Sequence, residues 1–198
     1  MAYPHWRYFL ALEADLKEIG RYIEISPDNF STYSIEIAHL YLAVGSEVDV
    51  VAKALSNQSA PQSTHENMDQ YRGTLSRAHP KLHTLDVFLP RYGLALLPWR
   101  EWDEDKNPPW WRQYNAVKHR RDTEFKQANL ENAVNALAGL FALVLYFYQP
   151  ALYDMELEPM TELFELDRQR QPGTVVSGRF ELPDYTYDYS LKPPYRHL

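Results

Sequence analysis

Apolar residues recur every three or four positions in three long stretches of the chain. They cover about residues 8–25, residues 32–55 and residues 129–149. This spacing is typical of helices that bury one face. Beyond Ala136 the third stretch is apolar around most of its circumference, and Pro150 ends it. The pattern therefore predicts three long helices, with the third at the centre of a bundle.

Shorter elements lie between and after these helices. Ser31 or Thr32 is expected to cap the second long helix. Ser63 with Glu66 forms a capping-box pattern, which predicts a shorter helix ending before Pro80. The segments LDVFL and LALLPW flank PRYG, and this pattern predicts a β-hairpin over about residues 84–99. TELFEL (161–166) is expected to add a helical turn.

A further helix is predicted for WWRQYNAVKHRR (110–121), because Pro108 and Pro109 mark its start. At 3.6 residues per turn, one face carries Arg112, Asn115 and His119. The remaining positions place aromatic and aliphatic side chains toward the protein. The expected packing residues are Trp110, Trp111, Tyr114 and Val117.

Together these elements predict a mainly α protein, an up-and-down bundle of four to five helices with a small β-hairpin insertion. The bundle is expected to cover residues 1–170. Residues 171–198 are rich in Pro and Tyr and poor in aliphatic side chains. They are expected to form an extended C-terminal arm that lies on the bundle or on a partner.

Composition restricts the function classes. The net charge is −7, so any contact with a polyanion must be local. There is no cysteine, which excludes thiolate chemistry and suits the cytoplasm. The longest apolar run, residues 136–148, is shorter than the roughly 18 residues of a membrane span, so no membrane partner is expected.

Several familiar catalytic patterns are missing from the sequence. It has no glycine-rich phosphate loop, no GxSxG and no HExxH. His79 and His83 are four residues apart, but Pro80 lies between them and no third ligand is evident. An ordinary surface pair is the expected role, and no metal or cofactor is predicted. His39 is also expected at the surface.

Glu47 lies on an apolar stripe of the second helix, together with Leu40, Ala43 and Val51. A buried carboxylate needs a partner, because its burial alone costs several kcal/mol or forces protonation. Two roles remain open for Glu47. It could hold a residue of a functional site, or it could form a buried pair that only fixes helix packing.

A local cationic excess is the strongest functional signal. Five cations and two acids lie between residues 112 and 126, an excess of three positive charges. The cations are Arg112, Lys118, Arg120, Arg121 and Lys126. Such a group can hold phosphate by charge and by guanidinium geometry. Alternatively, the cations form ion pairs at the end of a helix and complement its dipole.

The segments WWRQYNAVKHRR and FKQANLENAVNALAGLFALV resemble the second half of a HEPN (higher eukaryote and prokaryote nucleotide-binding) domain. SIEIAHLYLAVGSEVDVVAKAL (34–55) resembles the preceding long helix of prokaryotic HEPN-like proteins. The family signature is an arginine, four to six residues and a histidine, and Arg112 and His119 enclose six. Family nucleases commonly carry Asn, Asp or His directly after the arginine, whereas this chain has Gln113.

The resemblance implies a metal-independent endoribonuclease that pairs two such motifs across a homodimer. His119 would transfer the proton as an RNA 2′-OH attacks the phosphate, and Arg112 would neutralise the growing charge. Asn115 would orient the phosphate or the histidine. The RNA backbone would be bound by Lys118, Arg120 and Arg121, and Glu47 would support Arg112 or His119.

Two other functions stay open at this point. One is a non-catalytic HEPN-like binding or dimerisation module, in which Arg112, Asn115 and His119 form a structural network. The other is a nucleotide-binding regulatory domain that uses the same cationic face. A defence or toxin role, with a protein partner such as an antitoxin, is a further expectation of the resemblance.

Overall fold

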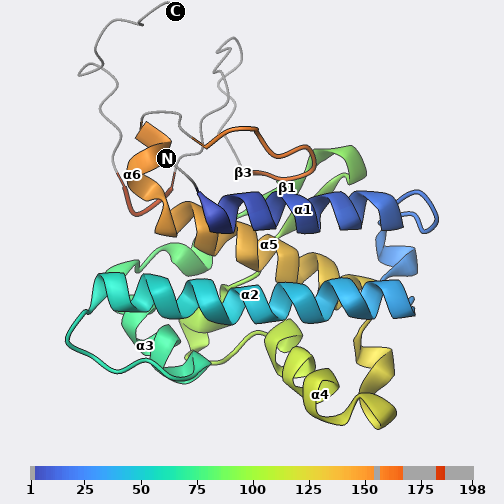
Figure 1. Cartoon of the computed structure of the whole chain (residues 1–198), viewed down its shortest axis with the longest axis horizontal. Coiled ribbons are helices and arrows are strands. Elements are labelled where there is room, and N and C mark those ends of the chain that lie inside the picture. Colours follow the sequence, from blue (N-terminus) through green and yellow to red (C-terminus); the bar gives the residue numbers. More distant parts are fainter. Residues whose placement is uncertain (1–2, 154–156, 167–181, 186–198) are drawn as a thin grey trace, which may run out of the picture.

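The computed structural model of the chain describes residues 3–153, 157–166 and 182–185. It is a helical bundle with a small sheet on one side (Figure 1), which confirms the predicted fold class. The α-helices are α1 (Pro4–Ile19), α2 (Ile35–Ser59), α3 (Met68–Ala78), α4 (Pro109–Glu124), α5 (Leu130–Phe147) and α6 (Gln149–Tyr153). Short 3-10 helices are η1 (Pro27–Asn29), η2 (Leu82–Thr84), η3 (Pro90–Tyr92), η4 (Arg100–Glu104) and η5 (Phe125–Gln127).

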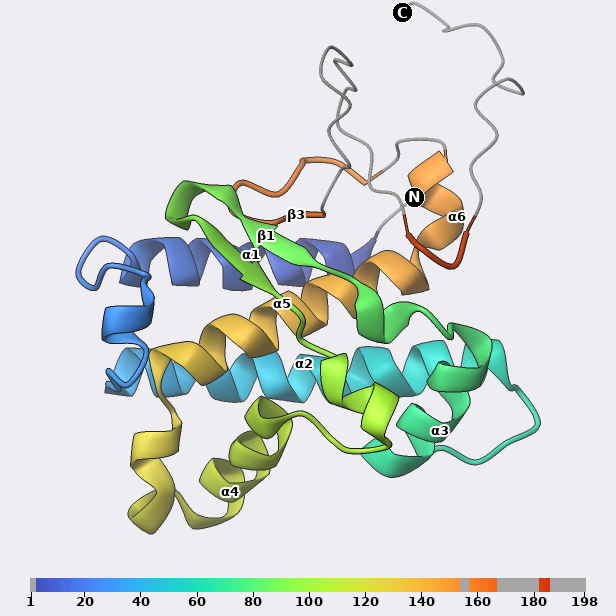
Figure 2. The ribbon, with the colours of Figure 1, turned by 180° about the vertical axis from the view of Figure 1, so that it is seen from behind.

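Helix α5 is the core of the bundle, as its apolar pattern predicts. It packs most extensively against α2 and also contacts α1 and α4. By length and composition alone α5 could cross a membrane, but 83% of its 18-residue apolar window is buried inside the protein. Such extensive burial is typical of a helix in the core of a bundle. Figure 2 shows α5 running between α1 and α2 from the rear.

The two longest helices, α2 and α5, run in the same direction, whereas α1 runs opposite to both (Figure 1). Two backbone hydrogen bonds join the start of α5 to the turn before α2. The Leu130 N–H donates to the Thr32 carbonyl, and the Glu131 N–H donates to the Phe30 carbonyl. This direction is possible because α3, the β1–β2 hairpin and α4 together form the connection that returns the chain.

The predicted hairpin is present. Strands β1 (Val87–Leu89) and β2 (Leu94–Leu96) pair antiparallel, with Val87 opposite Leu96. Gly93 ends the turn with φ 65°, a conformation that glycine adopts without strain. The helical prediction for residues 161–166 is wrong. Strand β3 (Glu165–Leu166) pairs with β1 and completes a sheet of order β2-β1-β3.

Glu13 explains why residues 161–166 are extended. This carboxylate of α1 is only 4% exposed. It accepts the Leu163 N–H at 2.8 Å, the Glu162 N–H at 3.1 Å and the Thr161 hydroxyl. Those backbone donors are then satisfied without a helix, so the segment crosses α1 and reaches β1 as a strand.

Helix α1 covers Pro4–Ile19 rather than about residues 8–25, and two helix caps differ from the predictions. Ser34, not Ser31 or Thr32, caps α2 by accepting the Ile37 N–H at 3.1 Å, and α2 extends to Ser59 rather than Leu55. Asn67 caps α3 by accepting the Gln70 N–H at 3.1 Å, so the Ser63 capping box does not begin this helix. Ser, Thr and Asn can each cap a helix by accepting its free N–H groups. Tertiary packing therefore determines which of several nearby candidates begins the helix.

Most of the expected C-terminal arm, residues 171–181 and 186–198, lies outside the described residues. Residues 182–185 are described and lie on the bundle. Leu182 is buried, and the Asp184 carboxylate accepts the Lys81 N–H at 2.9 Å and the Tyr146 hydroxyl at 2.6 Å.

Candidate functional site

The inner face of α4 is apolar and aromatic, as predicted. Trp110, Trp111, Tyr114 and Val117 are all buried. The Trp110 indole N–H donates to the Pro98 carbonyl at 2.8 Å, and the Tyr41 hydroxyl donates to the Trp110 carbonyl. These contacts fix the rotation of α4 about its axis, so its polar face must point away from the bundle.

Two glycines allow the aromatic side chains of α4 to approach the long helices closely. A Cβ atom at Gly45 of α2 would lie 2.2 Å from the Tyr114 ring, and one at Gly139 of α5 would lie 2.8 Å from the Trp110 ring. Both distances are shorter than any van der Waals contact. Glycine is therefore required sterically at both positions, and α4 is held tightly against α2 and α5.

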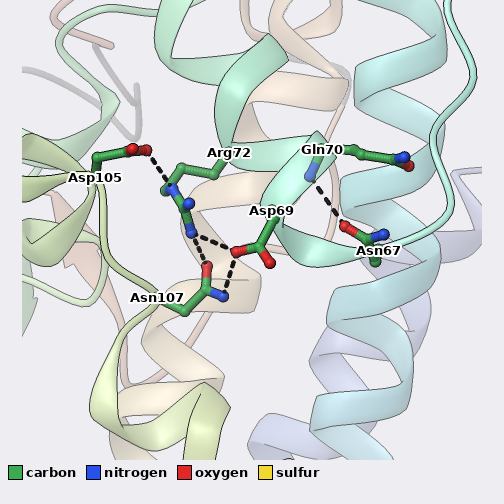
Figure 3. A network of polar contacts seen from close by, with 6 residues as sticks. All are labelled: Asn67, Asp69, Gln70, Arg72, Asp105 and Asn107. Carbon is green, nitrogen blue, oxygen red and sulfur yellow. Dashed lines mark hydrogen bonds and ion pairs between the residues drawn. The ribbon is translucent and has the colours of Figure 1, made fainter.

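Arg72 of α3 fixes the segment that leads into α4 (Figure 3). Its guanidinium group donates to Asp105 at 2.8 Å, to Asp69 at 2.8 Å and to the Asn107 side chain. Asn107 in turn donates to Asp69 at 2.9 Å. The Arg72 side chain is 12% exposed, so this network is partly shielded from water and orients the start of α4.

The outer face of α4 carries the predicted cations and the histidine. Arg112, Lys118, His119 and Arg121 are all exposed. Among the described residues, the side chains of Arg112, His119 and Arg121 make no hydrogen bond or ion pair, and Lys118 lies 5.6 Å from the Tyr114 ring centroid. Arg112 and His119 lie two turns apart on one face, roughly 10 Å along the axis. This face is available to a ligand.

The other two predicted residues of α4 are engaged within the helix. The Asn115 amide donates to the Trp111 carbonyl at 3.1 Å, one turn earlier. Arg120 has non-helical backbone angles (φ −142°, ψ 47°) and forms an ion pair with Glu124 at 3.4 Å. The kink comes directly after His119, so the spacing from Arg112 to His119 remains that of a regular helix.

Glu47 does not support Arg112 or His119 but binds His5 of α1. His5 Nδ1 and Glu47 Oε1 lie 2.6 Å apart, and the two side chains are 21% and 12% exposed. The sequence correctly indicated that this carboxylate needs a partner. The partner lies on α1 because the apolar stripe of α2 that carries Glu47 faces α1 and α5 at this height, away from the outer face of α4.

The histidines after α3 differ from the expected surface pair. His79 is buried, at 7% exposure, whereas His83 is partly exposed and lies 3.6 Å from Asp103. The described part of the chain holds no cluster of three or more His, Cys, Asp or Glu residues suited to a metal ion. His79 was missed as a polar core residue because its contacts, Ser59 and Tyr185, are 20 and 106 positions away.

Comparison with family models, with curated proteins and with solved structures gave no match. The α4 face and its residues Arg112 and His119, which resemble the HEPN signature, are therefore the features that point to a function.

Proposed function

We propose that the outer face of α4 binds RNA and cleaves it without a metal ion, in a HEPN-like manner. The observation that supports this best is that Arg112 and His119 are exposed on one face and have no partner among the described residues. Side chains that served only to hold the bundle together would form hydrogen bonds or ion pairs with its other residues. The rival structural network of Arg112, Asn115 and His119 finds no support in these contacts.

The chemistry follows from the two side chains. A neutral His119 accepts the proton of an RNA 2′-OH as that oxygen attacks the adjacent phosphorus. Arg112 donates hydrogen bonds to the phosphoryl oxygens, where negative charge grows. The 5′-oxygen then leaves with a proton and a 2′,3′-cyclic phosphate remains. Lys118 and Arg121 contact neighbouring phosphates, and Arg120 contributes if its pair with Glu124 opens.

A homodimer completes this proposal. The His119 of one protomer acts as the base. A separate acid is needed to donate a proton to the leaving 5′-oxygen. Two α4 faces across one cleft would supply it, as the HEPN resemblance implies. Under this proposal the protein acts on cytoplasmic RNA in a defence or toxin role, and a protein partner that covers α4 would inhibit it.

The test uses the purified full chain with EDTA and a 5′-labelled single-stranded RNA. We expect cleavage that leaves 2′,3′-cyclic phosphate ends and that fails at a single 2′-deoxy substitution. Arg112→Ala and His119→Ala should each reduce the rate about 100-fold or more. The matched controls are Arg77→Ala and His39→Ala, which remove exposed side chains elsewhere, and these should cleave like the parent.

Binding is measured separately on the His119→Ala protein. Lys118→Ala or Arg121→Ala should each reduce the slope of log K against log salt by roughly one, since each removes one phosphate contact. RNA bound with these slopes but never cleaved would identify a non-catalytic module. If the parent neither binds nor cleaves RNA, or if His119→Ala cleaves at the parent rate, the proposal is wrong.

Arg112→Ala and His119→Ala should both fold normally. Replacing an exposed side chain that has no partner changes the free energy of unfolding by no more than about 0.5 kcal/mol. Urea unfolding checks this. A loss of several kcal/mol in either variant would instead favour the structural network.

A further inference from the structure

A pocket of about 270 Å³ lies far from α4, where the C-terminal ends of α2, α3 and α5 meet residues 182–185. Its polar lining residues are Gln58, Ser59, His79, Tyr146, Gln149 and Tyr185. No side chain in the lining carries a full charge when His79 is neutral. The pocket therefore suits a small uncharged ligand with hydrogen-bonding groups.

His79 lies between two hydroxyl groups in this pocket. Its Nε2 atom is 3.3 Å from Ser59 Oγ, and its Nδ1 atom is 3.3 Å from the Tyr185 hydroxyl. A neutral imidazole has one donor and one acceptor nitrogen, so donation from Nδ1 to Tyr185 leaves Nε2 to accept from Ser59. A nucleophile next to a base that a third group orients is the arrangement of covalent catalysis, and its hydrogen bonds are often long without substrate.

The surroundings of His79 suit a base. Burial lowers its pKa below the ordinary 6.5, and the charge of Asp184 raises it in part. The imidazole is therefore neutral at pH 7, and the Asp184 carboxylate stabilises the imidazolium that forms when it accepts a proton. Asp184 is itself held by the Tyr146 hydroxyl and by the Lys81 N–H.

A purely structural role for His79 explains less of this arrangement. The helix cap at position 79 uses the backbone N–H, which donates to the Leu75 carbonyl at 2.7 Å, and not the side chain. A histidine that complemented the dipole at the end of α3 would need its positive charge, which burial disfavours. The two hydroxyl contacts satisfy both buried ring nitrogens, and the feature that a structural role leaves unexplained is the pocket beside them.

We propose that Ser59 and His79 are the nucleophile and base of an acyl-transfer site for a small uncharged carboxylic ester. Ser59 Oγ attacks the ester carbon while its proton moves to His79 Nε2. The carbon–alkoxide bond then breaks and the alcohol leaves with that proton. Water repeats the two steps and releases the acid from Ser59. The amides of Gln58 and Gln149 on the pocket wall are the available donors for the carbonyl oxygen.

The test uses the full chain and a small uncharged fluorophosphonate, which phosphonylates activated serines with loss of fluoride. Intact-mass and peptide analysis should show one adduct, on Ser59. Ser59→Ala should abolish it, whereas Ser63→Ala, the matched control in the next loop, should label like the parent. His79→Gln should reduce the labelling rate about 100-fold or more, whereas the exposed-site control His39→Gln should not.

The labelling rate should rise with pH through a midpoint below 6.5 and then level off, because the base must be neutral. The groups that face His79 are Ser59 from α2, Tyr146 from α5, and Asp184 and Tyr185 from the C-terminal segment. Tyr185→Phe keeps the ring and removes only the hydroxyl, so it should slow labelling without loss of folding.

Labelling of other serines at the parent rate in Ser59→Ala, or an unchanged rate in a folded His79→Gln protein, would overturn the proposal. So would the absence of any adduct together with no turnover of p-nitrophenyl acetate. Labelling of Ser59 is expected to be independent of the α4 face. Arg112→Ala and His119→Ala should therefore label like the parent.

Discussion

At the scale of single residues, two glycines inside helices have opposite surroundings. A Cβ atom at Gly45 would overlap the Tyr114 ring, whereas one at Gly73 of α3 would meet nothing within 4 Å. Both positions are glycines in helices, so the sequence alone does not distinguish them. The difference arises only from the docking of α4.

Gly45→Ala is therefore expected to lower the free energy of unfolding by about 1–3 kcal/mol or more, through overpacking. Gly73→Ala is the matched control and should be neutral or stabilising by up to about 1 kcal/mol, because alanine favours a helix. Urea unfolding of both variants and the parent measures the effect. Equal changes in the two variants would show that α4 does not pack on Gly45.

His79 should make stability depend on pH. Burial lowers the pKa of His79 in the folded state below 6.5. Between this folded-state pKa and pH 6.5, the unfolded chain therefore binds more protons than the folded one. Stability from this group is therefore complete above about pH 6.5 and is lost as the pH falls through the folded-state pKa. The Asp184 charge opposes the shift and limits its size.

The measurement is the urea midpoint from pH 8 to pH 5. His79→Gln should lose less stability over this range than the parent, whereas His39→Gln, at an exposed position of α2, should follow the parent. A parent and a His79→Gln protein with the same pH dependence would mean that the imidazole is not buried as described.

At the scale of elements, one carboxylate of α1 attaches a distant strand to the bundle. Glu13 accepts hydrogen bonds from three consecutive residues, 161–163, and thereby brings β3 to the edge of β1. Glu13→Gln replaces one acceptor oxygen by a donor that faces N–H groups. We expect a loss of about 1–3 kcal/mol in the free energy of unfolding, since buried donors are left unsatisfied.

The same variant should expose the strand locally. A protease specific for glutamate should cut at Glu162 or Glu165 faster in Glu13→Gln than in the parent. The matched control is Glu18→Gln on the exposed side of α1, whose ion pair with Arg21 contributes little. Equal cleavage rates in both variants would contradict the anchoring role of Glu13.

At the scale of the whole molecule, the proposed ribonuclease requires a symmetric dimer through the region of α4. Light scattering at tens of micromolar should give a mass of twice 23.3 kDa. A charge reversal on the outer face, Arg112→Glu, should change the dissociation constant of the dimer if this face lies in the shared cleft, because it alters the repulsion between two cationic faces, and Arg77→Glu on α3 should not. A parent that remains a monomer at these concentrations would exclude a shared cleft.

What the sequence by itself determined is the helices α1 to α5, the hairpin and the division of α4 into two faces. These features depend on local periodicity, proline and glycine, and a helix or a tight turn closes its hydrogen bonds within a few residues. The buried positions Trp110, Tyr114 and Val117 and the exposed positions Arg112 and His119 follow from that period alone.

What only the tertiary structure decided is the partner of each buried polar group. Glu13 binds residues about 150 positions away, Glu47 binds His5 across 42 positions, and His79 lies between Ser59 and Tyr185. The extended form of residues 161–166 follows from the same contacts. No local pattern encodes such pairs, because a buried charge or donor requires some partner, and the packing of distant segments determines which one.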